Sequence, residues 1–166
     1  MKVLVAVATR HGSTEEIAAL IARVLRLRGM DTVELPAADV EDMSEYDAVV
    51  LGSAVYAGHW LAPATSLVSR FQAQLVEVPV WLFSSGPVGF PLTPAKAEDM
   101  TGVVSAIGAI EHRLFAGKLD KSELGRLERA MVRMVRAPEG DYRDFGEVSH
   151  WAAAIAETLA AAAQTV

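Results

Sequence analysis

Short runs of apolar residues alternate with amphipathic segments along the whole 166-residue chain. The clearest runs, Lys2–Ala8 and Val78–Phe83, carry apolar side chains at consecutive positions instead of alternating them with polar ones. Continuous apolar strands are typical of parallel sheets that are covered by helices on both faces. We therefore predict five strands, at Lys2–Ala8, Thr32–Leu35, Ala48–Leu51, Val78–Phe83 and Glu111–Phe115.

The segments between these runs have the residue spacing of amphipathic helices. The clearest is Ser13–Arg28, where aliphatic residues recur at helical intervals. Ser13, followed three residues later by Glu16, forms the signature of a capping box and predicts that the helix begins there. The same spacing predicts three further helices, one after Pro63, one over Met100–Ile107 following Thr93-Pro94, and a last one opened by Asp144 with Glu147 three residues on.

Strand and helix segments alternate throughout, and no repeat, low-complexity tract or linker divides the chain. We predict a single α/β domain over residues 1–166, built on a doubly wound five-stranded parallel sheet in the order 2-1-3-4-5. In such a sheet the carboxyl ends of strands one, three and four meet at the switch point, where ligands bind. Candidate chemistry is therefore sought at those three ends.

The composition excludes several classes of function. The chain has no cysteine, which excludes disulfides, thiol nucleophiles and cysteine-ligated metal clusters, so that any redox chemistry needs a bound cofactor. A formal net charge of −6 disfavours a nucleic-acid partner, because phosphate contacts need a basic surface. No apolar run reaches the roughly 20 residues of a membrane span, and no signal peptide is evident, so we expect a cytoplasmic protein.

The turn after the first predicted strand leads directly into the clearest predicted helix and consists of Thr9, Arg10, His11, Gly12, Ser13 and Thr14. The start of a helix presents backbone N–H groups and the positive end of the helix dipole, which together suit a phosphate. Gly12 allows close backbone approach, the three hydroxyl side chains can donate hydrogen bonds, and Arg10 can supply charge from the rim. The alternative interpretation is that Ser13 only caps the helix.

The third and fourth predicted strands are followed by turns suited to a flat ligand. The loop from Gly52 to Trp60 combines two glycines with three rings, and its candidate contacts are Ser53, Ala54, Val55, Tyr56, Ala57, Gly58 and His59. We expect Tyr56 to stack on a planar ring and Trp60 to pack inside the protein. A third turn offers N–H donors for the polar edge of a heterocycle, from Ser84, Ser85, Gly86, Pro87, Val88 and Gly89.

The T-R-H-G-S-T stretch resembles the T-x-T-G-N-T phosphate loop of the flavodoxin family at Thr9, Gly12 and Thr14. His11 and Ser13 stand where that family usually has Thr and Asn. The two later turns stand where flavodoxins hold the flavin ring, and the resemblance spans nearly the whole chain. It implies a flavodoxin-like fold that binds FMN non-covalently, with Thr9–Thr14 on the phosphate and the other two turns around the ring.

Three local matches resemble the branch of flavodoxin-like enzymes that contains the quinone-dependent protoporphyrinogen oxidases. They are T-R-x-G-x-T at the first turn, Tyr-x-Gly-His at Tyr56–His59, and D-Y-R-D-F from Asp141 together with Trp151. This resemblance implies an oxidoreductase that passes electrons or hydride through FMN, with a quinone or a porphyrinogen as its partner and no catalytic side chain. Two alternatives stay open: a one-electron carrier that docks on a redox partner protein, and a flavin-free regulatory or interaction domain.

The four histidines fall into two groups. His11 and His59 lie in the candidate ligand turns, where a histidine can modulate the charge of a flavin. His112 and His150 have no partner at catalytic or metal-ligand spacing, and the sequence assigns them no role.

The segment from Lys118 to Arg136 is a candidate for the additional segment found in that branch. Its apolar residues between Leu124 and Val135 fall on one helical face, and the opposite face carries Arg126, Arg129, Arg133 and Arg136. Such a basic stripe can contact an anionic membrane, an acidic partner or a carboxylate-bearing porphyrin. We favour a helix whose charged face lies in water, with peripheral membrane contact as the alternative.

Overall fold

A computed structural model describes residues 1–56, 58–86, 100–120, 122, 125, 129 and 139–164. Within this part of the chain, five parallel strands form one sheet in the order β2-β1-β3-β5-β6. The strands are β1 (Lys2–Ala8), β2 (Asp31–Pro36), β3 (Ala48–Tyr56), β5 (Val80–Gly86) and β6 (Glu111–Ala116). The predicted α/β fold and strand order are confirmed, since the fourth and fifth predicted strands are β5 and β6. The short strand β4 (His59–Trp60) pairs antiparallel with the end of β3.

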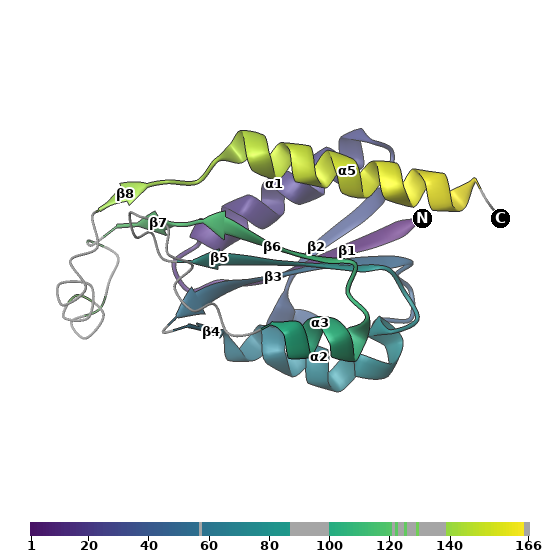
Figure 1. The fold of residues 1–166 in the computed structure, drawn as a ribbon, viewed down its shortest axis with the longest axis horizontal. Helices are drawn as coiled ribbons and strands as arrows, with labels where there is room; N and C mark the ends of the chain where they lie inside the picture. Colours follow the sequence, from purple (N-terminus) through teal and green to yellow (C-terminus); the bar gives the residue numbers. More distant parts are fainter. Residues whose placement is uncertain are drawn as a thin grey trace.

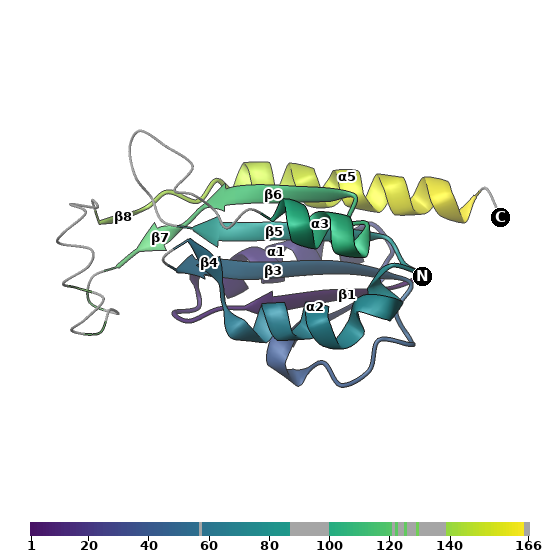
Figure 2. The same cartoon turned by 60° about the horizontal axis from the view of Figure 1, so that its bottom comes forward.

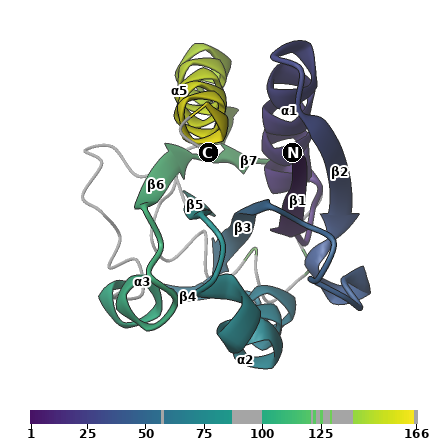
Figure 3. The same ribbon diagram turned by 90° about the vertical axis from the view of Figure 1, so that its right-hand side faces the viewer.

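Helices cover both faces of the sheet (Figures 1 and 3). The pair α1 (Ser13–Leu27) and α5 (Phe145–Ala163) lies on one face, and the pair α2 (Ala62–Leu75) and α3 (Thr101–Ile107) lies on the other. Along β1, Val3 and Val5 join the core under α1 and α5, whereas Leu4 and Ala6 join the core against α2. Both faces of the strand are buried, which is why the sequence shows no polar alternation there.

Three aromatic rings attach α5 to the sheet. The ring centroids of Phe83, Phe115 and Trp151 lie 5.5 to 6.1 Å apart, in tilted or edge-to-face pairs. The Trp151 Nε1 atom also donates a hydrogen bond of 2.8 Å to Glu111 at the start of β6. Because α5 is anchored in this way, the chain segment that precedes it lies at the carboxyl edge of the sheet, beside β7 (Lys118–Leu119) and β8 (Gly140–Asp141) (Figure 2).

The two helices on that face begin differently. The predicted capping box at Ser13 and Glu16 is wrong: Gly12 occupies the cap position of α1 with φ 78°, Ser13 is the first helical residue, and among the described residues no side chain caps this end. The predicted start of α5 is confirmed, because Asp144 accepts a hydrogen bond of 3.0 Å from the Glu147 backbone N–H. The amino end of α1 therefore keeps its first-turn N–H groups pointing at the carboxyl edge without a side-chain acceptor.

The other predicted helices agree with the structure within a residue or two. Helix α2 carries Pro63 in its first turn as predicted, and α3 begins at Thr101 instead of Met100. Thr93 and Pro94 lie outside the described residues. A short 3-10 helix, η1 (Ala37–Asp39), follows β2.

At their carboxyl ends β3 and β5 run several residues further than the sequence predicted, whereas β2 and β6 do so by one residue. Strand β3 extends to Tyr56 instead of ending at Leu51, and β5 extends to Gly86 instead of Phe83. The prediction that the second and third turns start at Gly52 and Ser84 is therefore wrong. These residues continue the ladder because small or hydroxyl side chains fit in the buried sheet and find hydrogen-bond partners there.

The close packing of β3 against β5 gives a direct test of the fold. A Cβ atom on Gly52 would lie 2.0 Å from the Phe83 ring, so Gly52→Ala should lower the free energy of unfolding by at least about 2 kcal/mol. Gly102→Ala is the matched control, since a Cβ there meets nothing within 4 Å and Gly102 is exposed in α3. That change should raise the free energy of unfolding by about 0.5 kcal/mol. Chemical denaturation measures both; equal effects would contradict this packing.

Candidate functional site

The first candidate turn joins β1 to α1. The Gly12 N–H donates a hydrogen bond of 3.1 Å to the Thr9 hydroxyl, and this bond shapes the turn before the helix. Gly12 has the left-handed φ that favours glycine, and a Cβ there would meet nothing within 4 Å. Thr9 and Ser13 are half-buried, whereas Thr14 is almost fully buried at 1% exposure. The turn thus places open space in front of the amino end of α1.

The second candidate segment meets this turn through an aromatic ring. The Tyr56 ring centroid lies 6.2 Å from that of His11, and the Arg10 guanidinium lies 5.4 Å from the Tyr56 centroid. Tyr56 pairs with His59 in the hairpin of β3 and β4, whose turn contains Gly58 with φ 86°. His59 is exposed, and Ala57 lies outside the described residues. The predicted meeting of the first two turns is confirmed.

The third candidate segment lies beside the second. In the ladder of β3 and β5, Ser84 is opposite Ser53 and Ser85 is opposite Ala54. A Cβ atom on Gly86 would lie 3.2 Å from that of Val55, so the ends of the two strands are in contact. Pro87, Val88 and Gly89 lie outside the described residues. The described parts of all three segments therefore share the carboxyl edge of the sheet (Figure 2).

Two of the candidate hydroxyls are engaged inside the protein. The Ser53 hydroxyl donates to the Ala54 carbonyl (2.8 Å) and accepts from the Leu61 N–H (3.0 Å). The Ser84 hydroxyl accepts a hydrogen bond of 2.7 Å from the Trp60 indole N–H. Both serines are fully buried. Their side chains hold the β3–β4 hairpin on the sheet, so that the Tyr56 ring, the exposed His59 side chain and the backbone are the described groups left to contact a ligand.

The bond between Trp60 and Ser84 continues to a histidine that the sequence left without a role. The Ser84 oxygen lies 2.8 Å from the His112 Nε2 atom. Because an indole only donates, Ser84 accepts from Trp60; its oxygen has a second lone pair, so it can either donate to a bare Nε2 atom or accept from a protonated one. Burial lowers the pKa of His112 and so favours the neutral imidazole. Only the register of β5 and β6 brings Ser84 and His112 together, and no local sequence motif predicts this contact.

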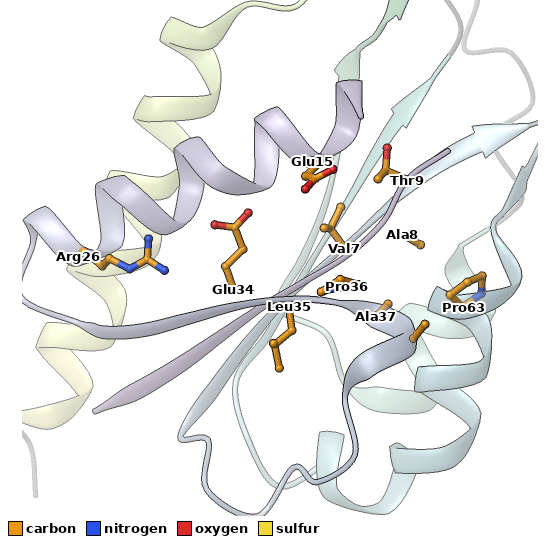
Figure 4. Close-up of a pocket in the computed structure, with 11 residues that line it drawn as sticks. Val7, Ala8, Thr9, Glu15, Arg26, Glu34, Leu35, Pro36, Ala37 and Pro63 are labelled. Carbon is orange, nitrogen blue, oxygen red and sulfur yellow. The ribbon is translucent and has the colours of Figure 1, made fainter. Parts of the chain in front are cut away.

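A cavity of about 460 Å³ opens on the β2 side of the first turn (Figure 4). Thr9 lines it together with the ends of β1 and β2, η1 and Pro63 of α2. Figure 4 shows Glu34 between Arg26 and Glu15 along its wall. Burial raises the pKa of Glu34, an effect that Arg26 opposes and Glu15 reinforces. Among the described candidate residues, Thr9 is the one that this cavity shares with the predicted site.

The predicted arginine stripe falls mostly outside the described residues, which include Arg129 but not Arg126, Arg133 or Arg136. Arg129 is exposed and donates a hydrogen bond of 3.2 Å to the Ser122 carbonyl. The segment begins in β7, and β8, which pairs with β7, follows it in the chain. In the described part of the chain, no helix combines the length and the apolar character needed to cross a bilayer.

Comparison with known proteins identifies the family to which this chain belongs. The profile of the flavodoxin domain family matches residues 4–145, and the chain belongs to that family. Among curated proteins, a similar sequence is the protoporphyrinogen IX dehydrogenase [quinone] of Escherichia coli strain K12, 24% identical over an alignment that covers 94% of this chain and 95% of that protein.

Solved structures agree on the fold. A flavodoxin from the domain Archaea superposes with a TM-score of 0.61 at 16% identity, over 95% of this chain and 98% of that one. The flavodoxin of Streptococcus pneumoniae gives 0.60 at 20% identity, over 97% and 99%. The rubredoxin oxygen:oxidoreductase of Desulfovibrio gigas gives 0.65 at 17% identity, over 96% of this chain and 36% of that one.

The neutral form of His112 predicts how stability depends on pH. The pKa of His112 in the folded protein lies below the ordinary 6.5, so the unfolded chain takes up the proton first as the pH falls. The stabilisation from neutral His112 is fully present above about pH 6.5 and is lost as the pH falls through the lowered pKa. We expect His112→Gln to flatten the decline in unfolding free energy between pH 6.5 and 5.

The matched control is His150→Gln, because His150 is exposed on α5. Its stability should follow the wild-type pH profile when denaturant unfolding is measured at half-unit steps. Parallel profiles for wild type and His112→Gln would show that the chain from Trp60 to His112 does not depend on a neutral imidazole.

Proposed function

We propose that this protein is an FMN-dependent oxidoreductase that binds its flavin non-covalently at the carboxyl edge of the sheet. The observation that carries the proposal is the 6.2 Å approach of the Tyr56 ring to His11 beside the uncapped start of α1. A helix start without a side-chain cap suits a phosphate, and an aromatic ring beside it suits a planar ring system. FMN carries both groups in one molecule.

The residues of the first turn fit the phosphate end of FMN. The N–H groups in the first turn of α1 would donate to the phosphate oxygens, and the Thr9 and Ser13 hydroxyls stand on either side of Gly12. Open space at Gly12 gives the phosphate room to approach the backbone. Arg10, at the exposed rim, would add positive charge.

The flavin ring would lie between the Tyr56 hairpin and the segment that begins at Ser84 and continues through Gly89. The bound flavin supplies the electron and hydride chemistry. The protein's own part is to orient the ring, exclude water from one side with Tyr56, and fix the hairpin through the bond from Trp60 to Ser84. No side chain is assigned a catalytic role.

The E. coli relative is named for oxidising protoporphyrinogen IX with a quinone, and its similarity spans almost the whole of both chains. On that basis we propose a porphyrinogen or a related reduced substrate as electron donor and a quinone as acceptor. Each turnover would remove two electrons and two protons from the donor and convert one quinone into one quinol.

Two glycines with the same strained geometry test the phosphate site. Gly12 and Gly29 have φ 78° and 85°, both face open space, and they lie at opposite ends of α1. Changing either to alanine should lower the free energy of unfolding by about 1 kcal/mol. Only Gly12→Ala should also weaken FMN binding, by about tenfold, because it disturbs the N–H groups that face the phosphate. Titration followed by flavin fluorescence measures this; equal affinities in the two variants would contradict the proposed phosphate site.

The reaction itself is tested with protein reconstituted with FMN. We expect added FMN to give a yellow protein whose reduced form is reoxidised by a quinone and whose oxidised form is reduced by a porphyrinogen under anaerobic conditions. The Gly12→Ala variant should bind less FMN, and its activity should fall in proportion to the amount of FMN that it binds. A stable one-electron form without quinone or porphyrinogen turnover would indicate a carrier, and a protein that stays colourless would indicate a flavin-free domain.

A further inference from the structure

Arg143 is a buried charge at the amino end of α1, placed there by a segment far away in the sequence. Its side chain is 4% exposed. It lies just before α5, in the stretch that leads out of the ribbon of β7 and β8. Its Nη1 atom donates to the Ser13 carbonyl at 3.0 Å and lies 3.1 Å from the Glu16 carboxylate. Arg143 therefore contacts the first turn of α1 directly.

The other side of the guanidinium contacts residues of the same segment that carries Arg143. Nε and Nη2 donate to the two carboxylate oxygens of Asp141, at 2.8 and 2.6 Å, and the guanidinium lies 4.9 Å from the Phe145 ring centroid. Asp141 binds one edge of the planar guanidinium, and Ser13 and Glu16 bind the other edge. A lysine has a single nitrogen at the end of a flexible chain, and it cannot hold both sides at once.

The same segment is linked to the end of β5 through Gly117, which lies between β6 and β7. The Tyr142 N–H donates a hydrogen bond of 3.2 Å to the Gly117 carbonyl, and a Cβ atom on Gly117 would lie 2.9 Å from the Gly86 carbonyl oxygen. The ribbon that carries Arg143 is thus packed at one end against the first turn of α1 and at the other against the third candidate segment.

We propose that Arg143 is a positioning residue for phosphate binding: it holds the first turn of α1 so that the N–H groups of this turn converge on the phosphate of FMN. The inference rests on the proposed function. Arg143 acts through Ser13 and Glu16 and does not itself need to touch the flavin. Its loss would also leave the carboxylates of Asp141 and Glu16 without their shared cation beside an anion site.

The experiment compares FMN with riboflavin, which has the same ring and no phosphate. Dissociation constants for both flavins are measured by fluorescence quenching for wild type, Arg143→Lys and Arg143→Gln. The matched control is Arg113→Lys, because Arg113 also bridges two carboxylates, Glu111 and Glu147, but is 41% exposed and lies on β6. Hydrogen exchange of the Glu16 amide, which donates to the Gly12 carbonyl at 3.1 Å, is followed in the flavin-free proteins.

For a positioning role we expect both Arg143 variants to bind FMN at least about tenfold more weakly while riboflavin affinity changes less than about twofold. The Glu16 amide should exchange faster in both Arg143 variants, and Arg113→Lys should match wild type. Two results would overturn this inference and leave the proposed function standing. In the first, the Arg143 variants bind FMN and riboflavin equally more weakly than wild type does. In the second, wild type binds FMN tightly and the variants leave the ratio of the two dissociation constants unchanged. Failure of the wild type to bind either flavin would overturn the proposed function and the inference with it.

Discussion

The structure depends on how α1 begins. A left-handed Gly12 turns the chain from β1 into the helix, and its N–H is tied back to the Thr9 hydroxyl. No described side chain accepts from the first-turn N–H groups, whereas α5 on the same face is capped by Asp144. A glycine at the cap position costs only about a few tenths of a kcal/mol relative to a side-chain cap, and it leaves the first-turn N–H groups available to a ligand.

Two parts of the surrounding fold converge on this helix end. The ladders of β1, β3 and β5 place Tyr56 next to the turn, and the aromatic cluster under α5 places Arg143 against Ser13. The polar groups nearby are mostly satisfied within the protein, as the Ser84 hydroxyl shows. The described part of the edge presents a helix start, the Tyr56 ring, backbone groups and the exposed side chains of Arg10 and His59, an arrangement that suits the proposed cofactor site.

The sequence predicted those features that depend on local pattern. Continuous apolar runs identified the parallel sheet, and Asp144 with Glu147 identified the start of α5 correctly. The same reasoning failed at Ser13, because a glycine one residue earlier took the cap position, and it ended β3 and β5 too early, because buried Ser53 and Ser84 look like turn residues. The contacts of His112 and Arg143 depend on strand register and helix docking across 28 and 130 residues, which no local pattern encodes.

The most direct test is nuclear magnetic resonance of the backbone amides during a titration with FMN. A phosphate at the start of α1 predicts the largest shifts at Gly12, Ser13 and Thr14, with ring-current shifts at Tyr56 and Gly58. Shifts that gather instead around Arg26 and Glu34 in the cavity on the β2 side, with none at Gly12, would contradict the account.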